Sequence, residues 1–368
     1  MVRLPEVREA LDLSVASLGI VLFIGAVGAL TALLLSSFVI ERTGAKRAVV
    51  VGFSTIVVGQ VVTATGIFLD NLVVFTIGGF IAGFGFGIGD VGINLEGTEL
   101  EKLANKSRMP MLHGMYSAGT LAGALLGALL ITLNFALPLQ CLTFGAVLCV
   151  VLFFGLRVLP STTGIREHAP SPGTTTAPTP NQSRHWRVLL LGIGILCISL
   201  AEGGANDWLA IALVQDYGTL PETAALVFAA MTTGMLIARF SGDVLIDRFG
   251  RAAVLRVFVA LGTLGVLLVA FNISVTVAVV GSLLWGVGVA LGFPVFISSA
   301  ADGERSSRDV ARVTAFGYSA FLVGPPVLGF IANATSLIAM VYLLAGLLTI
   351  VIFVAGATRP PVGRVASE

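Results

Sequence analysis

The sequence predicts an all-α polytopic membrane protein, and three observations support this fold class. Of its 368 residues, 56% are hydrophobic and only 11% are charged, whereas a soluble domain carries roughly a quarter charged residues. Apolar runs of about 20 residues recur along the chain, each long enough to cross ~30 Å of hydrocarbon as a helix. Two basic turns of similar sequence, one in each half, indicate an internal duplication.

Eleven membrane spans are predicted, five before a polar segment and six after it. Residues 1–14 are polar and too short to span a bilayer. The first five spans cover about 15–40, 48–69, 72 onward, 109–133 and 137–156. The third is glycine-rich and then becomes acidic, so it is expected to leave the membrane as a helical extension. The last six cover about 187–214, 222–246, 252–271, 275–300, 310–333 and 337–356.

The polar segment between the two groups, residues 158–186, is rich in Pro, Thr and Ser. Such a composition buries too little apolar surface to fold, so a flexible linker is predicted. The domains expected are therefore an N-terminal bundle over 1–157 and a C-terminal bundle over 187–368.

The Lys and Arg residues predict the orientation. All 21 except Arg3, Arg8 and Arg239 fall on one side of the predicted spans, and the positive-inside rule makes that side cytoplasmic. The linker and the C terminus are then cytoplasmic, while residue 1 lies outside.

The duplication is measured from the two basic turns. The turn at 239–251 ends in Asp247-Arg248-Phe-Gly250-Arg251, and Glu41-Arg42-Thr-Gly44 overlays its first four residues at an offset of 206. Gly28 overlays Gly234 at the same offset. With a shift of one to three residues, four more glycines and one tripeptide also align: Gly78, Gly83, Gly85 and Gly89 on Gly281, Gly286, Gly288 and Gly292, and Tyr116-Ser117-Ala118 on Tyr318-Ser319-Ala320.

Two repeats joined by a cytoplasmic linker resemble the major facilitator superfamily, and the 247–251 turn resembles that family's loop between the second and third helices of each half. The resemblance implies six helices in each half. At offset 206, Met1 falls on Asp207, so the first span of the second half has no partner and the visible spans correspond to family helices 2–6 and 7–12. We therefore expect either that the start is internal to a longer reading frame or that the gene is truncated.

Within the family, several segments are similar to a bacterial inner-membrane branch loosely related to fucose permease. They are Asp90–Glu101, Leu112–Ser117, Glu202–Trp208 and Gly324-Pro325-Pro326. The resemblance implies a transporter with no settled substrate. The fifth family helix has Gly119-x-x-x-Gly123-Ala124 in place of the Gly-Pro of drug/proton antiporters, which weakens drug efflux as an alternative.

The strongest candidate for chemistry is Glu202, about fifteen residues into its span and so close to the bilayer midplane. Placing a charged side chain at the bilayer midplane costs about 2.5–3.5 kcal/mol, so such a residue is expected to have a function. Ser199, Glu202 and Asn206 form a polar stripe predicted to face the central cavity. It would bind substrate or a proton, since removal from water favours the neutral form of a carboxyl group; the alternative is a structural hydrogen bond. Asp207 would line the outer mouth or cap a helix, and Trp208 would stack on a sugar or anchor at the interface.

A second candidate cluster lies towards the cytoplasmic end of the third span. Asp90 and Asn94 share a face with Glu101 and are predicted to form a proton site or gate, with His113 at the start of the next helix. The alternative is a salt-bridge latch with neighbouring Lys and Arg residues, which is favoured for Glu99 and Glu101.

The basic turns are predicted to act as a conformational latch. In this interpretation Arg239 pairs with Asp243, four residues on, and neither binds substrate. The remaining latch residues are Asp247, Arg248, Gly250, Arg251, Glu41, Arg42 and Gly44.

The sequence thus predicts a secondary transporter of a small polar solute such as a sugar, coupled to protons and working by alternating access. Drug/proton efflux, or a non-transporting sensor or inactive truncated product, are the alternatives. No phosphate-binding loop, HExxH or GxSxG is present, so an enzyme is not indicated. Cys141, Cys149 and Cys197 lie in apolar spans without metal-ligand spacing. The expected partners are the solute, protons and the bilayer, with no cofactor, metal or nucleic acid, and the chain is expected to be monomeric.

Overall fold

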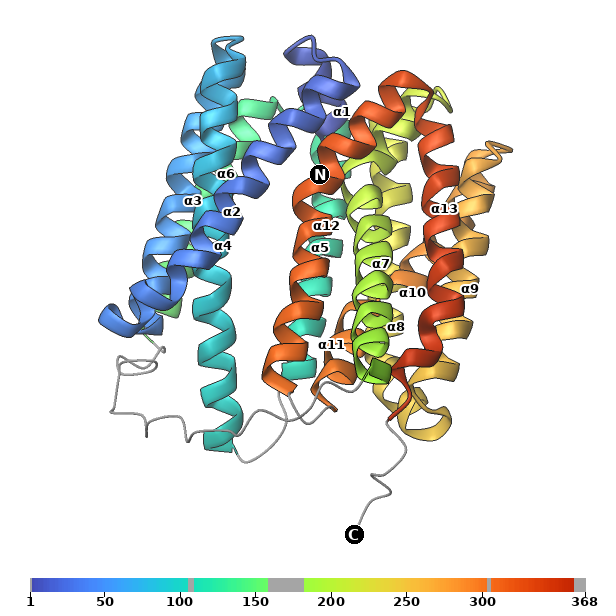
Figure 1. The fold of residues 1–368 in the computed structure, drawn as a ribbon. Coiled ribbons are helices and arrows are strands. Elements are labelled where there is room, and N and C mark those ends of the chain that lie inside the picture. The colour runs from blue at the N-terminus through green and yellow to red at the C-terminus, as the bar shows by residue number, and fades with distance from the viewer. Residues whose placement is uncertain (1, 105–108, 158–181, 303–305, 361–368) are drawn as a thin grey trace. The chain divides into compact units, whose positions relative to one another are not determined.

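The computed structural model describes residues 2–104, 109–157, 182–302 and 306–360, which form helices joined by short turns (Figure 1). The first half contains α1 Leu4–Ala10, α2 Val15–Thr43, α3 Ala45–Phe68, α4 Leu72–Ala104, α5 Met109–Thr132 and α6 Leu137–Gly155. The second half contains α7 Gln182–Gln215, α8 Pro221–Phe249, α9 Arg251–Ala270, α10 Val275–Val289, α11 Gly292–Ala301, α12 Ser306–Ala334, α13 Leu337–Val354 and the 3₁₀ turn η1 Ala355–Thr358.

Eleven stretches within the described residues are long and apolar enough to cross a membrane, with α10 and α11 counted as one. Five precede α7 and six begin with it, so the predicted all-helical class and span count are confirmed. The length of the apolar runs was enough for both predictions. A backbone in hydrocarbon must satisfy its own hydrogen bonds, and a helix does so within one segment.

The packed residues form two compact units. Unit 1 comprises residues 1–5, 114–132 and 180–368, and unit 2 comprises 6–113 and 133–179. Most of α5 therefore groups with the second half of the sequence, although the sequence assigned it to the first bundle. Inside unit 1, the ring of Phe240 on α8 lies against Gly114 on α5, and this contact helps to join α5 to that unit.

Each unit contains the same close helix packing. In unit 2, a Cβ atom on Gly28 would clash with the carbonyl of Phe80, and one on Gly83 with the carbonyl of Gly25. In unit 1, a Cβ atom on Gly234 would clash with the carbonyl of Leu283, and one on Gly286 with the carbonyl of Met231. Small residues let helix backbones approach this closely in a membrane. The aligned glycines of the sequence thus hold equivalent helix pairs, α2 with α4 and α8 with α10.

The two basic turns also share a backbone conformation. Gly44 separates α2 from α3 with φ 84°, and Gly250 separates α8 from α9 with φ 81°. Each glycine donates its N–H to an isoleucine carbonyl four residues earlier, Ile40 or Ile246. Positive φ is costly for residues with a Cβ atom, which explains why glycine occupies both positions.

The structure differs from the predicted elements in two places. The predicted linker ran to residue 186, but α7 already begins at Gln182; residues 158–181 lie outside the described part of the chain. The predicted span 275–300 is two helices, because α10 ends at Val289 and α11 begins at Gly292.

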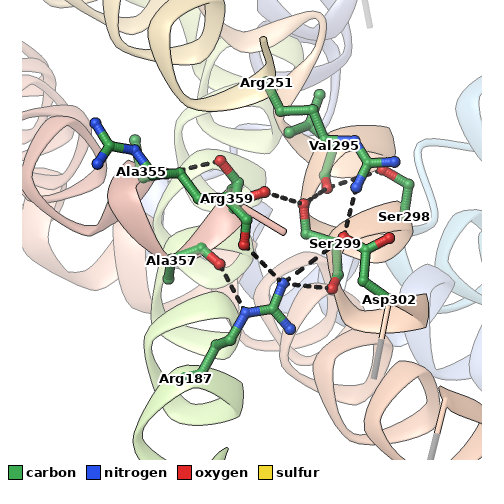
Figure 2. Close-up of polar contacts among 10 residues, drawn as sticks. Arg187, Arg251, Val295, Ser298, Ser299, Asp302, Ala355, Ala357 and Arg359 are labelled. Atoms are coloured by element: carbon green, nitrogen blue, oxygen red, sulfur yellow. Dashed lines mark hydrogen bonds and ion pairs between the residues drawn. The ribbon is translucent and has the colours of Figure 1, made fainter. Parts of the chain in front are cut away.

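Polar contacts join the helices at one end of unit 1 (Figure 2). Arg187 near the start of α7 donates to the carbonyls of Ser299 (2.8 Å) and Ala357 (3.0 Å). Its Nη2 also lies 3.8 Å from Oδ2 of Asp302, which accepts a 2.7 Å hydrogen bond from Arg251. The beginnings of α7 and α9, the end of α11 and η1 are therefore fixed to one another.

A second set of contacts joins helices at the opposite end of α7. Asp216 accepts a 3.0 Å hydrogen bond from the backbone N–H of Ile338, in the first turn of α13. Asn272, after α9, donates to the Asp216 carbonyl at 3.1 Å. Tyr217 donates its hydroxyl to the carbonyl of Val269, and burial raises the pKa of this phenol above its ordinary value.

Candidate functional site

The candidate site lies on α7, the helix that carries the predicted polar stripe. This helix packs against α8, α11, α12 and α13, so most of its surface is enclosed. The residues that remain partly accessible recur every three or four positions, at Leu196, Leu200, Gly203 and Asn206. Such spacing places them on one side of the helix, and Glu202 lies beside this accessible strip.

Glu202 forms an ion pair with Arg239 of α8. Its Oε1 lies 3.5 Å from Nη2 of the arginine, and the two side chains are only 14% and 21% exposed. The guanidinium also donates from Nη1 to the hydroxyl of Ser117 on α5 and from Nε to the carbonyl of Ala290 at 3.4 Å. One arginine therefore joins four helical segments of unit 1 around a carboxylate.

This arrangement corrects one sequence prediction. Arg239 was predicted to pair with Asp243 on its own helix, but its guanidinium contacts α7, α5 and the α10–α11 junction. Asp243 is exposed, and among the described residues it has no ion pair. A buried guanidinium needs several acceptors, and the neighbouring helices supply them where the outer face of α8 does not.

The other predicted residues of α7 divide by accessibility. Asn206 is partly accessible, as the stripe requires. Ser199 is fully buried, and its hydroxyl has no hydrogen-bond partner among the described residues. Asp207 is buried, and Trp208 is fully buried with its indole N–H unpaired in the described part of the chain. Trp208 is therefore placed neither to stack on a solute nor to anchor at a membrane interface, because α7 is enclosed on most sides.

Aromatic side chains lie next to the accessible strip. The ring of Phe321 on α12 is 3.4 Å from where a Cβ atom of Gly203 would lie. Phe293, at the start of α11, has its ring centroid 6.4 Å from that of Phe321 and 6.2 Å from that of Tyr318. Tyr318 remains 39% exposed. The residue after Glu202 thus borders a group of three aromatic rings, which the sequence patterns did not indicate.

The second predicted cluster lies in unit 2. Asp90 is exposed and Asn94 is half-buried on α4, and the Asn94 amide donates to the Asp90 carbonyl at 2.9 Å. These two residues share a face, as their spacing predicted. The side chains of Glu101, Lys102 and His113, and residues 105–108, lie outside the described part of the structure. Glu96, which was given no role from sequence, is a buried acidic residue of α4.

Three arginines among the remaining latch residues have local or cross-helix contacts. Arg42 stacks over Phe38 at 3.5 Å and Arg248 lies 5.2 Å from the ring of Phe249. Arg251 forms its ion pair with Asp302. Asp302 was missed from sequence; the available signal was a carboxylate at the end of a span, among the basic residues assigned to one side of the membrane.

Two repeats of close-packed spanning helices, with an ion pair within the second repeat, define a multi-pass membrane protein of the two-repeat transporter class. The protein-family model described as Major Facilitator Superfamily matches residues 1–302 of the sequence and, in a second match, residues 191–367. The chain therefore belongs to the Major Facilitator Superfamily, as the sequence predicted. It is an MFS transporter and not an enzyme.

Curated relatives agree with this assignment, and solved structures share the fold. The chain is 26% identical over 339 residues to an uncharacterised MFS-type transporter of Yersinia pestis, covering 90% of this chain and 84% of that protein. It is 28% identical to an uncharacterised transporter of Sinorhizobium fredii, with 91% and 87% covered. A single-residue mutant of the nucleoside transporter NupG superposes with a TM-score of 0.74 at 14% identity, over 96% and 93% of the two chains. FucP in the outward conformation gives 0.62 at 15% identity, over 97% and 94%.

Proposed function

We propose that the protein is a proton-coupled secondary transporter of a small polar solute, such as a sugar or a small polar metabolite. The observation that carries the proposal is the Glu202–Arg239 ion pair within membrane-spanning helices. Charged side chains are rare at such positions and mark transport pathways or proton relays. In this proposal Glu202 carries the proton, and Arg239 stabilises its ionised form.

The neighbouring side chains support a solute that has both polar groups and a ring. Asn206 offers an amide donor and acceptor one turn beyond Glu202, and Phe293, Tyr318 and Phe321 offer aromatic faces. Aromatic faces pack against the C–H surface of a ring while the amide and carboxylate bind its hydroxyl groups. This combination favours a hydroxylated cyclic solute over a wholly apolar drug.

The proposal extends to topology. We place the linker and the C terminus in the cytoplasm of a bacterial cell, on the positive-inside rule, and we take residues 1–157 and 187–368 as the two bundles. The Arg187–Asp302 end of unit 1 is then cytoplasmic, since Arg187, Arg251, Arg256 and Arg359 gather there. Asp90 and Asn94 are proposed as a second polar site on α4.

Uptake into proteoliposomes tests the function. Purified protein is supplied with labelled sugars, nucleosides and small polar metabolites, with and without an inward proton gradient. We expect gradient-driven accumulation of at least one solute. Glu202→Gln should abolish accumulation but keep solute exchange at equal pH, because exchange needs no net proton movement.

Glu222→Gln is the matched control, since Glu222 lies in the first turn of α8; it should accumulate solute like the parent protein. Gradient-driven accumulation that survives Glu202→Gln would remove Glu202 from coupling. The absence of flux across the whole panel would favour a non-transporting sensor, and flux confined to apolar drugs would favour efflux.

A further inference from the structure

The junction between α10 and α11 has a specific chemical cause. Pro294 lies four residues after Ala290, where a regular helix would supply an N–H to the Ala290 carbonyl. Proline has no N–H, so that carbonyl loses its helical donor. The next hydrogen bond is present, since Val295 donates to Leu291 at 3.0 Å. The helix therefore breaks at residues 290–291.

Arg239 supplies the donor that Pro294 lacks. Its Nε lies 3.4 Å from the Ala290 carbonyl, while Nη2 of the same guanidinium pairs with Glu202. The guanidinium is planar and rigid, so its nitrogens cannot move independently. A displacement of the group towards or away from Glu202 changes its contact with the helix break.

The two helices that meet at this break pack mainly against different neighbours, although both also contact α7 and α9. α10 packs against α8 and α9, where glycines hold the backbones together. α11 packs against α7 and α12, and its far end is held by the contacts of Ser299 and Asp302 (Figure 2). The break therefore separates α10, which its neighbours fix tightly, from the short α11. Arginines of α7 and α9 hold the far end of α11, and its near end follows the Ala290 carbonyl that Arg239 contacts.

We propose that Arg239 relays the charge state of Glu202 to the helix break, so that α11 changes its position or mobility relative to α10 when Glu202 is neutralised. The proposal rests on the proposed function, in which Glu202 takes up a proton. Loss of the carboxylate charge removes the attraction that holds Nη2. The guanidinium then shifts towards its remaining acceptors, Ser117 and the Ala290 carbonyl.

The charged and titratable groups around Glu202 leave Arg239 as the relay. α7 itself carries the buried carboxyl group of Asp207, five residues beyond Glu202. Of the helices packed against α7, α10 and α11 contain no ionisable side chain, and α13 contains only Tyr342. α12 contributes Tyr318 and three charged residues of its first two turns, Arg308, Asp309 and Arg312. The remaining ionisable groups of α8 are Glu222 in its first turn and Asp243, Asp247 and Arg248 towards its end. Within the described residues, Arg239 alone forms an ion pair with Glu202.

Spin labelling tests the relay without requiring transport. Ser298 is partly accessible on α11, and within the described residues its hydroxyl bonds only its own helix, through Val295 at 3.1 Å, so Ser298→Cys carries the nitroxide. Val280→Cys on α10 carries the reference label. Both are made in a background in which Cys141, Cys149 and Cys197 are replaced by Ala. Spectra are recorded in nanodiscs in mildly acidic and mildly alkaline buffer.

We expect the label at 298 to change its line shape with pH and the label at 280 to remain unchanged. Glu202→Gln should fix the acidic spectrum at both pH values. Pro294→Ala restores an N–H for Ala290 and leaves the ion pair in place, so the response at 298 should be lost. Arg239→Lys keeps the charge but loses Nε, and should lose the response as well.

The relay is overturned if Pro294→Ala and Arg239→Lys respond to pH like the parent, or if the 298 label is silent in a protein whose uptake depends on Glu202. The second result would leave the proposed function standing. A response at 298 that follows Glu202, in a protein with no flux for any solute, would instead support the relay and sink the transport proposal.

Discussion

Arg239 and Glu202 bring opposite charges to 3.5 Å across the interface between α8 and α7. The two side chains are largely shielded, so water solvates each charge only in part. Removing one partner leaves the other uncompensated, and this costs more than removing both.

Arg239→Gln is therefore expected to destabilise the protein at neutral pH by about 3 kcal/mol, the lower end of the range for breaking a buried pair. The double variant Arg239→Gln with Glu202→Gln should recover part of that loss, since no charge is then left unpaired. Thermal unfolding in detergent measures both. Equal melting temperatures for the single and double variants would show that the charge is not the cause.

Gly250 gives a second prediction. Its φ is 81°, and a Cβ atom added there would have nothing within 4 Å. Gly250→Ala therefore meets no steric contact and suffers only from its backbone conformation, which costs roughly 1–2 kcal/mol. Gly44→Ala should lose about as much. Gly119→Ala, in open space within α5, should be neutral or stabilise by up to ~1 kcal/mol. Chemical denaturation compares the three, and a neutral Gly250→Ala would contradict the assigned turn.

Close packing of α8 with α10 gives a third. A methyl group on Gly286 would clash with the backbone carbonyl of Met231, which cannot rotate away. Gly286→Ala should therefore cost about 1–3 kcal/mol through overpacking. Gly346→Ala on α13 has no atom within 4 Å and is the matched control. Comparable melting temperatures for the two variants would rule out the proposed helix approach.

Substitutions at Asp302 and Asp243 distinguish the ion pairs found in the structure from the Arg239–Asp243 pair predicted from the sequence. Asp302→Asn removes the carboxylate charge that Arg251 and Arg187 share, and should cost about 0.5–1 kcal/mol, since the pair is partly exposed. Asp243→Asn should change stability little, because that carboxylate is exposed and its predicted partner lies elsewhere. A larger effect at Asp243 than at Asp302 would restore the sequence-based latch.

Solute affinity discriminates between the residues of the α7 stripe. Asn206→Ala should raise the KM for the transported solute by roughly five-fold, the worth of a hydrogen bond of about 1 kcal/mol. Ser199→Ala should leave KM unchanged, because Ser199 is fully buried. A KM that rises with Ser199→Ala and not with Asn206→Ala would place the solute elsewhere.

The sequence was sufficient for the spans because apolar length leaves a membrane segment few alternatives to a helix. The turn glycines were also predictable, since Gly44 and Gly250 recur at a fixed offset and impose the same backbone conformation. At Arg239, spacing along the helix predicted the wrong ion-pair partner. Asp243 is its neighbour one turn away, yet the direction of the side chain and the packing of α7 against α8 decide the actual partner.

Two features of the site depended on tertiary contacts that spacing does not encode. Ser199 and Asn206 share a stripe by periodicity, but neighbouring helices cover Ser199 and leave Asn206 partly accessible. The break at 290–291 did have a local signal, the sequence Gly292-Phe-Pro294, in which proline removes a helical donor. That signal predicts a broken helix, but not that Arg239 occupies the freed carbonyl.

α7 is secured at its two ends by separate contacts, and this has a mechanical consequence. At 34 residues and 1.5 Å per residue it is about 50 Å long. Arg187 ties its beginning to α11 and η1, while Asp216, just past its end, holds the first turn of α13. Because both ends are held, α7 cannot slide along its axis without breaking the Arg187 contacts or the Asp216 contact.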